Sequence, residues 1–146
     1  MNRERVRKQL ETDEGVVYEI YEDHLGYATF GIGHLVRDED KEYAWKVGTK
    51  VSRSRVEEVF EQDLDVAVNE CAILYELWET YPAEVQEVLV NMLFNLGRPR
   101  LSKFKNFKKA LDNADWSKAA VEGRDSLWHR QVTNRAERLM VRLENV

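Results

Sequence analysis

The chain has 146 residues, a length that suits one domain and leaves little room for two separate cores. Apolar residues make up 43% of it, and 5 Phe, 6 Tyr and 4 Trp exclude an intrinsically disordered chain. The longest apolar run, Cys71 to Tyr75, is far shorter than the roughly 18 to 20 residues of a membrane span, and the single cysteine excludes an intramolecular disulfide.

Charge is unevenly distributed around the net value of −5. Residues 1–52 carry 8 basic and 11 acidic side chains, residues 53–87 carry 2 and 10, and residues 88–146 carry 12 and 6. The last third is therefore basic and could hold an anionic ligand despite the overall sign. No apolar segment follows the charged N-terminus, so we expect no secretory signal peptide and a protein made in the cytosol.

The N-terminal third predicts a short helix and then a β-hairpin. Residues 2–12 have two apolar side chains one helical turn apart, and Gly15 ends this helix. Residues 18–33 alternate apolar and polar side chains around a turn with Asp23 first and Gly26 last, the positions that a type I turn favours.

Two faces alternate along the strand that returns from this turn. Thr29, Gly31 and Gly33 share one face, and Phe30 and Ile32 share the other. We expect the apolar face to pack, and the Thr29 face to stay open because its glycines leave space.

The rest of the chain predicts helices. Residues 53–79 form a long one that Ser52 or Ser54 can cap. Its apolar stripe keeps helical spacing throughout and consists of Val56, Val59, Phe60, Leu64, Ala67, Cys71, Leu74 and Trp78. A second helix starts at Pro82 and ends at Gly97. Shorter helices are expected over residues 103–111, over 116–122 with Asp115 as cap, and over 134–143. One hairpin among many helices gives an α+β fold.

Glu14, Asp23 and Thr29 lie within 16 residues of one another. A carboxylic acid that protonates a leaving oxygen, with a second group that orients water, is the equipment of a glycosidase. Acidic pairs are also common as solvated surface groups in a chain that is 34% charged, so the spacing alone does not decide between the two interpretations.

The stretch DEGVVYEIYEDHLGYATFGIGH, residues 13–34, resembles the active-site signature of the T-even phage lysozyme family, the endolysins of glycoside hydrolase family 24. That family has a Glu, an Asp nine residues later and a Thr six residues after that, and Glu14, Asp23 and Thr29 keep these intervals. Three later stretches resemble the family in the right order, namely VFEQDLDVAV (59–68), VNMLFNLG (90–97) and WHRQVTNRAER (128–138).

The resemblance implies a mostly helical, two-lobed lysozyme-like domain over residues 1–146, with the substrate cleft between the lobes. Its parts would be a small β-containing lobe over about 13–52, an interlobe helix over about 53–79, and a helical lobe over about 80–146 with the N-terminal helix 2–12.

The family pattern also implies roles for single residues. It makes Glu14 the general acid and Asp23 with Thr29 the pair that holds the attacking water in an inverting reaction. Further positions that match are Leu35 and Phe94, which would line saccharide sites, and Arg135, which would pair with the acid. Phe107 and Glu122 depart from the family pattern, which has a small hydroxyl residue and an asparagine there, so the outer subsites do not follow from the resemblance.

Other residues carry two interpretations. His34 could bind a metal with His24 or His129, but no recognised ligand spacing supports a metal, and the resemblance makes Asp63 its hydrogen-bond partner instead. Cys71 could be a nucleophile or a buried structural residue, and the absence of a nearby histidine favours the latter.

Trp128 and the basic segment 98–109 are also open to two interpretations. Trp128 could stack on sugar or belong to the core, and the core is favoured. The segment RPRLSKFKNFKK interleaves two Phe with six basic residues, which could bind single-stranded nucleic acid or anionic wall polymer, or form an ordinary solvated helix face.

The leading hypothesis is a phage lysozyme, or endolysin, of the EC 3.2.1.17 type. It would hydrolyse the β-1,4 bond between N-acetylmuramic acid and N-acetylglucosamine in bacterial peptidoglycan, without metal or cofactor, for host cell lysis and with antimicrobial effect. We expect a monomer that binds no nucleic acid, accumulates in the host cytoplasm and reaches the wall through a separate pore protein, a holin. The alternatives are a virion-borne lysozyme, a lytic transglycosylase that uses Glu14 alone, and a catalytically silent module that binds cell wall or nucleic acid.

Overall fold

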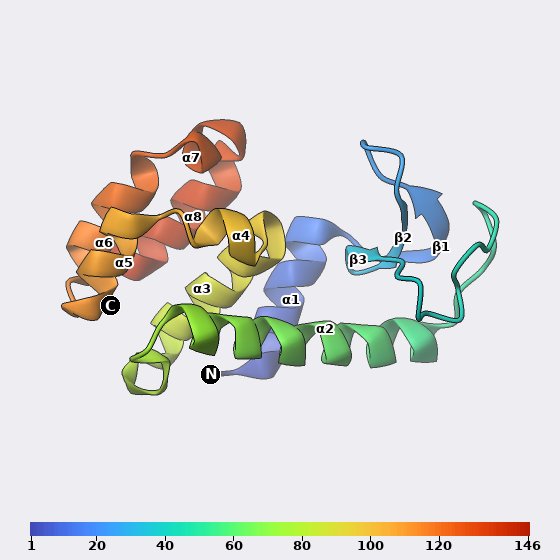
Figure 1. Cartoon of the computed structure of the whole chain (residues 1–146), viewed down its shortest axis with the longest axis horizontal. Coiled ribbons are helices and arrows are strands. Elements are labelled where there is room, and N and C mark those ends of the chain that lie inside the picture. The colour runs from blue at the N-terminus through green and yellow to red at the C-terminus, as the bar shows by residue number, and fades with distance from the viewer. The chain divides into compact units, whose positions relative to one another are not determined.

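The structure, a computed structural model, describes all 146 residues from Met1 to Val146. It is mostly helical with one small antiparallel sheet, which confirms the predicted α+β, lysozyme-like fold class (Figure 1). The chain forms two compact units. We call them the helical unit, Met1–Val6 with Ala67–Val146, and the β-containing unit, Arg7–Val66. No helix is both long and apolar enough to cross a lipid bilayer.

The β-containing unit holds a three-stranded sheet in the order β1-β2-β3. Its strands are β1 (Val17–Glu22), β2 (Ala28–Gly31) and β3 (His34–Leu35). The predicted hairpin is confirmed, because β1 and β2 pair antiparallel and the Gly26 amide donates to the Asp23 carbonyl at 2.9 Å. Strand β3 is only two residues long and was not predicted.

Two helices have one end in the β-containing unit. The sequence predicted a helix over residues 2–12 with Glu14 beyond its end. Helix α1 spans Arg3–Glu14, so Glu14 is instead its last residue. Helix α2 spans Arg53–Leu74, and the Ser52 hydroxyl accepts the Arg55 amide at 3.1 Å, which identifies Ser52 as the cap. The division between the units falls within α2, between Val66 and Ala67.

Helix α2 ends earlier than the predicted residue 79. Its apolar stripe is buried as expected as far as Cys71. Trp78 is also buried, but it belongs to a separate one-turn 3-10 helix, η1 (Trp78–Thr80). Buried apolar residues at helical spacing thus continue past the point where the helix stops.

The helical unit contains six further helices. They are α3 (Ala83–Leu96), α4 (Arg98–Leu101), α5 (Lys105–Asp112), α6 (Trp116–Arg124), α7 (Leu127–Gln131) and α8 (Thr133–Glu144). The predictions for α3, α5, α6 and α8 are confirmed, as is the Asp115 cap, which accepts the Lys118 amide at 3.1 Å. Helix α8 packs against α3, α6 and α7, and α5 packs against α6 (Figure 1).

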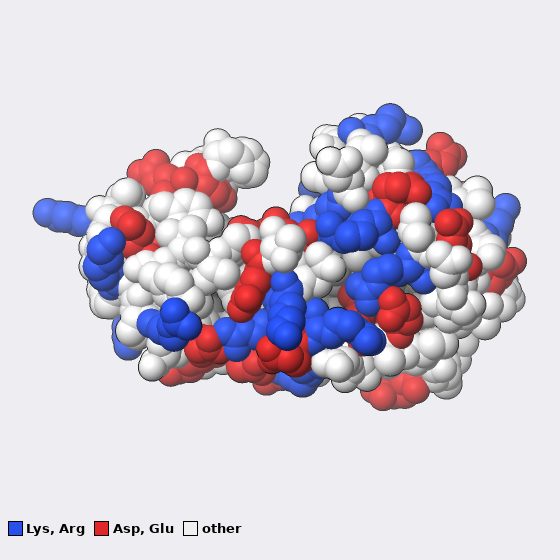
Figure 2. Space-filling view, turned by 180° about the vertical axis from the view of Figure 1, so that it is seen from behind, with Lys and Arg blue, Asp and Glu red and all other residues white.

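Charged side chains stabilise the helical unit from its edge. The buried Glu87 accepts hydrogen bonds from Arg5 at 2.7 Å and from Arg142 at 3.1 Å, which joins three helices and holds the pKa of this carboxyl below its usual value against the effect of burial. On the face drawn in Figure 2, basic and acidic side chains are interleaved over both parts of the molecule.

Candidate active site

Three residues stand side by side across the sheet of the β-containing unit. Tyr21 on β1 is the partner of Thr29 on β2, and Thr29 is the partner of Leu35 on β3. Because directly paired residues point to the same face, these side chains form one row. Leu35 is 51% exposed, so this row presents apolar surface to solvent next to a hydroxyl.

Glu14 and Asp23 both lie near the phenol of Tyr21. The pKa of Tyr21 is raised, first by burial and then by the negative charges of Glu14 and Asp23. Both carboxylates therefore lie close enough to Tyr21 for their charges to act on its phenol. The structure thus places Glu14 and Asp23 within charge range of Tyr21, the cross-strand neighbour of Thr29, and sequence reasoning did not predict this neighbour.

The turn fixes the carboxylate of Asp23. Its Oδ1 accepts the amides of Leu25 and Tyr27, each at 2.9 Å, and its own amide donates to the Tyr27 carbonyl at 2.9 Å. These bonds hold the side chain in one orientation and occupy one oxygen. The other oxygen is not used by the turn and can accept a proton or a hydrogen bond from a ligand.

Thr29 is 4% exposed, so the prediction that its face stays open was wrong. Its hydroxyl donates to the Tyr27 carbonyl at 2.9 Å. Since the only proton of the hydroxyl is directed at this carbonyl, its lone pairs remain as acceptors for a water molecule. Thr29 is thus a buried, oriented acceptor and not an exposed surface group.

The two glycines beside Thr29 allow close packing and do not leave open space. A Cβ at Gly33 would lie 3.2 Å from Glu14 Oε2, so the absence of a side chain lets the turn between β2 and β3 pass next to the acid. A Cβ at Gly31 would lie 3.2 Å from the Val56 side chain on α2. Both glycines have positive φ, +67° at Gly31 and +64° at Gly33, which favours glycine at these positions.

A buried histidine fastens this sheet to α2. His34 Nδ1 lies 2.7 Å from Asp63, the partner that the resemblance predicted, and Nε2 lies 2.7 Å from Asp40, which was not predicted. Burial lowers the pKa of His34, but the bonds and charges of Asp63 and Asp40 outweigh burial and raise it. The histidine is therefore held between two carboxylates, and no cluster of His, Cys, Asp or Glu suitable for a metal ion is present.

Phe94 and Arg135 belong to the helical unit. Phe94 is half-buried on α3, and Arg135 on α8 donates from Nε to the Asn91 side chain at 2.9 Å. The contact with Asn91 was not expected from the sequence. The proposed saccharide contact of Phe94 and the pairing of Arg135 with Glu14 stay predictions.

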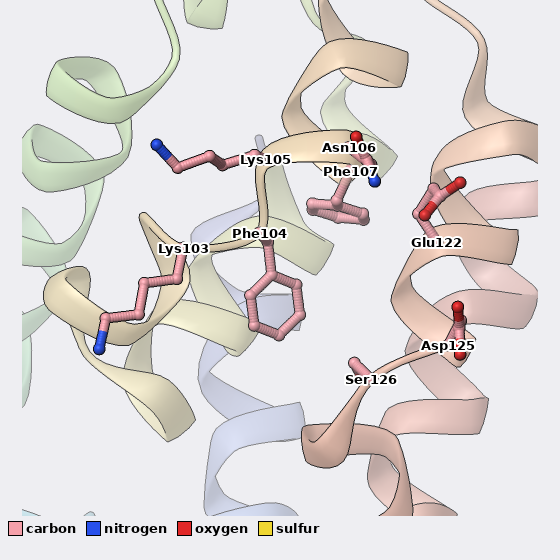
Figure 3. Close-up of a pocket in the computed structure, with 8 residues that line it drawn as sticks. All are labelled: Lys103, Phe104, Lys105, Asn106, Phe107, Glu122, Asp125 and Ser126. Carbon is pink, nitrogen blue, oxygen red and sulfur yellow. The ribbon is translucent and has the colours of Figure 1, made fainter.

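The two positions that depart from the family pattern meet at one pocket of the helical unit. Phe107 is buried and Glu122 half-buried, and both line a pocket of about 280 Å³ between α5 and α6. Figure 3 shows the rings of Phe104 and Phe107 between the lysines that precede them in the chain and two acidic side chains, Glu122 on α6 and Asp125 just after it. A buried aromatic ring and a carboxylate thus occupy the places of two small polar groups.

Cys71 and Trp128 are core residues, as the sequence favoured. Burial raises the pKa of the Cys71 thiol to about 12, which leaves no reactive thiolate. Trp128 is 2% exposed and donates its indole proton to Asn95 at 2.7 Å. The basic segment 98–109 is split between α4 and α5, and its Phe104 packs edge-on against Trp128.

Comparison with known proteins gives the family. The sequence model of the phage lysozyme family matches residues 11–144. The chain belongs to the phage lysozyme family. This lysozyme-family chain is 30% identical to probable T4-type lysozyme 2 of Dictyostelium discoideum over 92% of its length and 91% of the relative. It is also 30% identical to probable T4-type lysozyme 1 of the same organism, over 95% and 93%.

A third relative is much longer. The pre-baseplate central spike protein Gp5 of Enterobacteria phage T4 is 29% identical over 90% of this chain, but the match spans only 26% of that protein. Membership of the phage lysozyme family thus gives the present chain a lysozyme-like hydrolase function, with peptidoglycan as the substrate class.

Proposed function

We propose that this protein is a muramidase that hydrolyses the β-1,4 bond between N-acetylmuramic acid and N-acetylglucosamine with inversion at the anomeric carbon. The observation that carries the proposal is that Asp23 and Thr29 both hydrogen-bond to the backbone of Tyr27, while Glu14 lies against Gly33 in the turn that follows β2. Two carboxyl groups with a water-holding hydroxyl are what an inverting glycosidase requires.

Glu14 is the general acid in this proposal. Its proton passes to the glycosidic oxygen as the bond from that oxygen to the anomeric carbon breaks, so the leaving sugar departs as a neutral alcohol. Gly33 allows this carboxyl to lie against the turn between β2 and β3, since any Cβ there would meet Glu14 Oε2 at 3.2 Å. The half-buried environment of Glu14 limits competition from bulk water.

Asp23 and Thr29 hold the nucleophilic water. One O–H of the water donates a hydrogen bond to the Asp23 oxygen that the turn does not use. The other O–H donates to the Thr29 hydroxyl oxygen, because the Thr29 proton is itself donated to the Tyr27 carbonyl. The water lone pair is then directed away from both groups, toward the anomeric carbon. As its oxygen bonds to that carbon, its proton moves to Asp23, and the configuration inverts.

The biological setting that we propose is host cell lysis. The protein would be an endolysin that accumulates in the host cytoplasm as a monomer and reaches the peptidoglycan after a holin permeabilises the membrane. The match to a spike protein of phage T4 favours one alternative, a lysozyme carried by the virion. Protein found in purified phage particles of the source phage, and not in the soluble lysate, would favour that alternative.

The deciding experiment is digestion of purified peptidoglycan sacculi followed by mass spectrometry of the products. A muramidase gives muropeptides with reducing N-acetylmuramic acid, and NMR of freshly released products shows the α anomer if the configuration inverts. Products lighter by one water, with a 1,6-anhydro ring, would instead identify a lytic transglycosylase. Sacculi that bind the protein but stay intact would identify a silent wall-binding module.

A further inference from the structure

A pocket of about 240 Å³ lies in the β-containing unit and shares no residue with the candidate active site. We call it the Trp45 pocket. It is lined by Lys41, Glu42, Trp45, Lys50, Val51, Ser52 and Arg55, which come from the segment between β3 and α2 and from the first turns of α2. The proposed mechanism uses none of these residues.

The ionic groups of this pocket leave a positive charge in an acidic unit. Glu42 is 1% exposed, and Arg55 donates to both of its oxygens, from Nε at 2.8 Å and Nη2 at 2.9 Å, so these two charges cancel. Lys41 and Lys50 remain, both exposed. Lys50 lies 3.2 Å from Glu19, but exposed pairs of this kind are weak and exchange readily with other anions.

The loop fixes the backbone at Trp45, a residue that is partly exposed. Ala44, the residue before it, has a φ of 65°, a left-handed conformation that a residue with a Cβ rarely adopts. The Trp45 amide donates to the Glu42 carbonyl at 3.0 Å, which closes the turn. Trp45 is 38% exposed and lines the pocket, so part of this residue is accessible to a ligand there. Backbone strain of this kind concentrates at ligand-binding segments.

We propose that the Trp45 pocket binds a sugar ring that carries an anionic substituent, a carboxylate or a phosphate. The apolar C–H face of a pyranose packs on an exposed indole, and Lys41 and Lys50 attract the anion. The volume suits one ring and is smaller than the pockets that take drug-sized ligands. This inference rests on the proposed function only for the source of the sugar, a cell-wall polymer.

A lipid surface is the other ligand that such a loop could meet. Tyr43 is 58% and Val47 60% exposed near the lysines, and this composition also occurs in segments that lie on membranes. However, Lys41 and Lys50 line a pocket together with Trp45, and a flat lipid surface cannot enter a pocket. A concave pocket with a ring on its wall favours the sugar.

The test uses single sugars, which contain no glycosidic bond to hydrolyse. We would titrate the full-length ¹⁵N-labelled protein with N-acetylmuramic acid, N-acetylglucosamine and N-acetylglucosamine 6-phosphate, and follow the four indole N–H signals by NMR. Trp45→Phe assigns the Trp45 signal. We expect this signal to shift when the sugar with the carboxylate or the sugar with the phosphate is added. Neutral N-acetylglucosamine should bind with an affinity at least about threefold weaker. Tighter binding of N-acetylmuramic acid would indicate peptidoglycan as the source of the sugar. Tighter binding of N-acetylglucosamine 6-phosphate would indicate a phosphate-bearing wall polymer.

Two lysine variants give the matched control. Lys50→Ala should weaken the preference for the anionic sugars, whereas Lys46→Ala, which changes an exposed lysine of the same loop that does not line the pocket, should leave it unchanged. No shift of the Trp45 signal at about 20 mM of either anionic sugar, or a shift only with anionic lipid vesicles, would overturn the proposal. Sacculus digestion is measured separately, so intact sacculi with a shifted Trp45 signal would reject only the proposed function.

Discussion

The division of labour between Glu14 and Asp23 follows from what holds each carboxyl group. Asp23 is tied by two backbone amides into the hairpin turn, an environment that suits a fixed charge next to a water molecule. Glu14 ends a helix and lies against Gly33, where no side chain separates it from the turn between β2 and β3. This difference in surroundings supports the proposed roles of Asp23 as the base and Glu14 as the acid.

Glu14→Gln should lower the rate of peptidoglycan hydrolysis by at least about a thousandfold, because an amide of nearly the same volume has no proton to give to the leaving oxygen. Thermal unfolding should change little. The rate is measured as loss of turbidity of a sacculus suspension. Glu22→Gln, an exposed carboxylate of the same hairpin, is the control and should keep full activity. Retained activity in Glu14→Gln would remove this residue from the mechanism.

Thr29→Val should impair both activity and stability, because the hydroxyl is buried and bonded. The Tyr27 carbonyl keeps its bond from the Asp23 amide, so the loss of the second donor should cost about 1 kcal/mol in the free energy of unfolding. Thr29→Ser keeps the hydroxyl and should retain most of the activity. Urea unfolding and the turbidity assay measure the two effects. Equal activities of the valine and serine variants would show that the hydroxyl does not hold the water.

The sequence indicates the candidate catalytic residues, but it does not indicate how deeply they are buried or which residues lie beside them. The intervals among Glu14, Asp23 and Thr29 are visible in the sequence because the three residues lie on one short helix-and-hairpin segment, and their catalytic roles stay a prediction. The burial of Thr29 could not be predicted, since alternation separates two faces but does not say which distant segments cover them. Tyr21 was missed for the same reason, because the strand register that places it next to Thr29 is not visible in the alternation.

At the scale of elements, α6 and α8 meet so closely that one glycine decides their packing. A Cβ at Gly123 would lie 2.4 Å from the Met140 sulfur, a separation that requires the methionine or a helix to move. Gly123 has an ordinary helical backbone, so the lack of a side chain serves packing and not conformation. This glycine therefore sets the distance between the two helices.

Gly123→Ala should destabilise the protein by about 1 to 3 kcal/mol through overpacking. Alanine in place of glycine within a helix usually stabilises by roughly 1 kcal/mol, so the sign of the change is the test. Urea denaturation gives the free energy of unfolding. Ser117→Ala on the exposed start of α6 is the control, with a change near zero. A gain in stability from Gly123→Ala would mean that the helices have room to adjust.

The His34 bridge between β3 and α2 should make stability depend on pH. Its raised pKa means that the folded protein binds the proton more tightly, so its contribution is complete below the ordinary value of 6.5 and decreases as the pH rises through the folded pKa. Asp40 acts at the acidic end of the pH range. Its pKa is lowered, so its carboxylate stabilises the fold above pH 3.8, and this contribution is lost as the pH falls through the pKa of the folded protein. The bridge should be strongest between these values.

We therefore expect the difference in free energy of unfolding between the wild type and His34→Asn to be largest near pH 5 to 6 and to shrink toward pH 9. Arg37 and Arg55, which face the same carboxylates, stay charged over this range and do not add a transition. His24→Asn, an exposed histidine, is the control. A difference that does not vary with pH would show that His34 acts only by packing.

Helices with a strong local signal were predicted, and the shortest elements were not. Pro82, Gly97 and Asp115 mark helix ends by their own chemistry, and the structure places helix ends there. Strand β3 and the helices α4 and α7 have two to five residues, too few for a periodic pattern to develop. The end of α2 was placed too late because Trp78 continues the stripe from another element.

At the scale of the whole molecule, the net charge of −5 is divided unequally between the units. The β-containing unit carries 8 basic and 15 acidic side chains, a net charge of −7, and the helical unit carries 14 and 12, a net charge of +2. Glu14 and Asp23 thus belong to the acidic unit. An anionic wall polymer that approaches them is repelled over a distance that the ionic strength sets.

Hydrolysis of anionic sacculi should therefore be faster at moderate ionic strength than at very low ionic strength. Raising the salt from about 0.01 to 0.1 M shortens the Debye length from roughly 30 to 10 Å, which screens the repulsion but leaves short-range contacts largely intact. The measurement is the initial rate of turbidity loss across this range, with the rate on neutral glycol chitin as the control, which should show no such rise. A rate on sacculi that falls steadily from the lowest salt would mean that attraction to local basic groups, such as Lys41 and Lys50, controls the encounter instead.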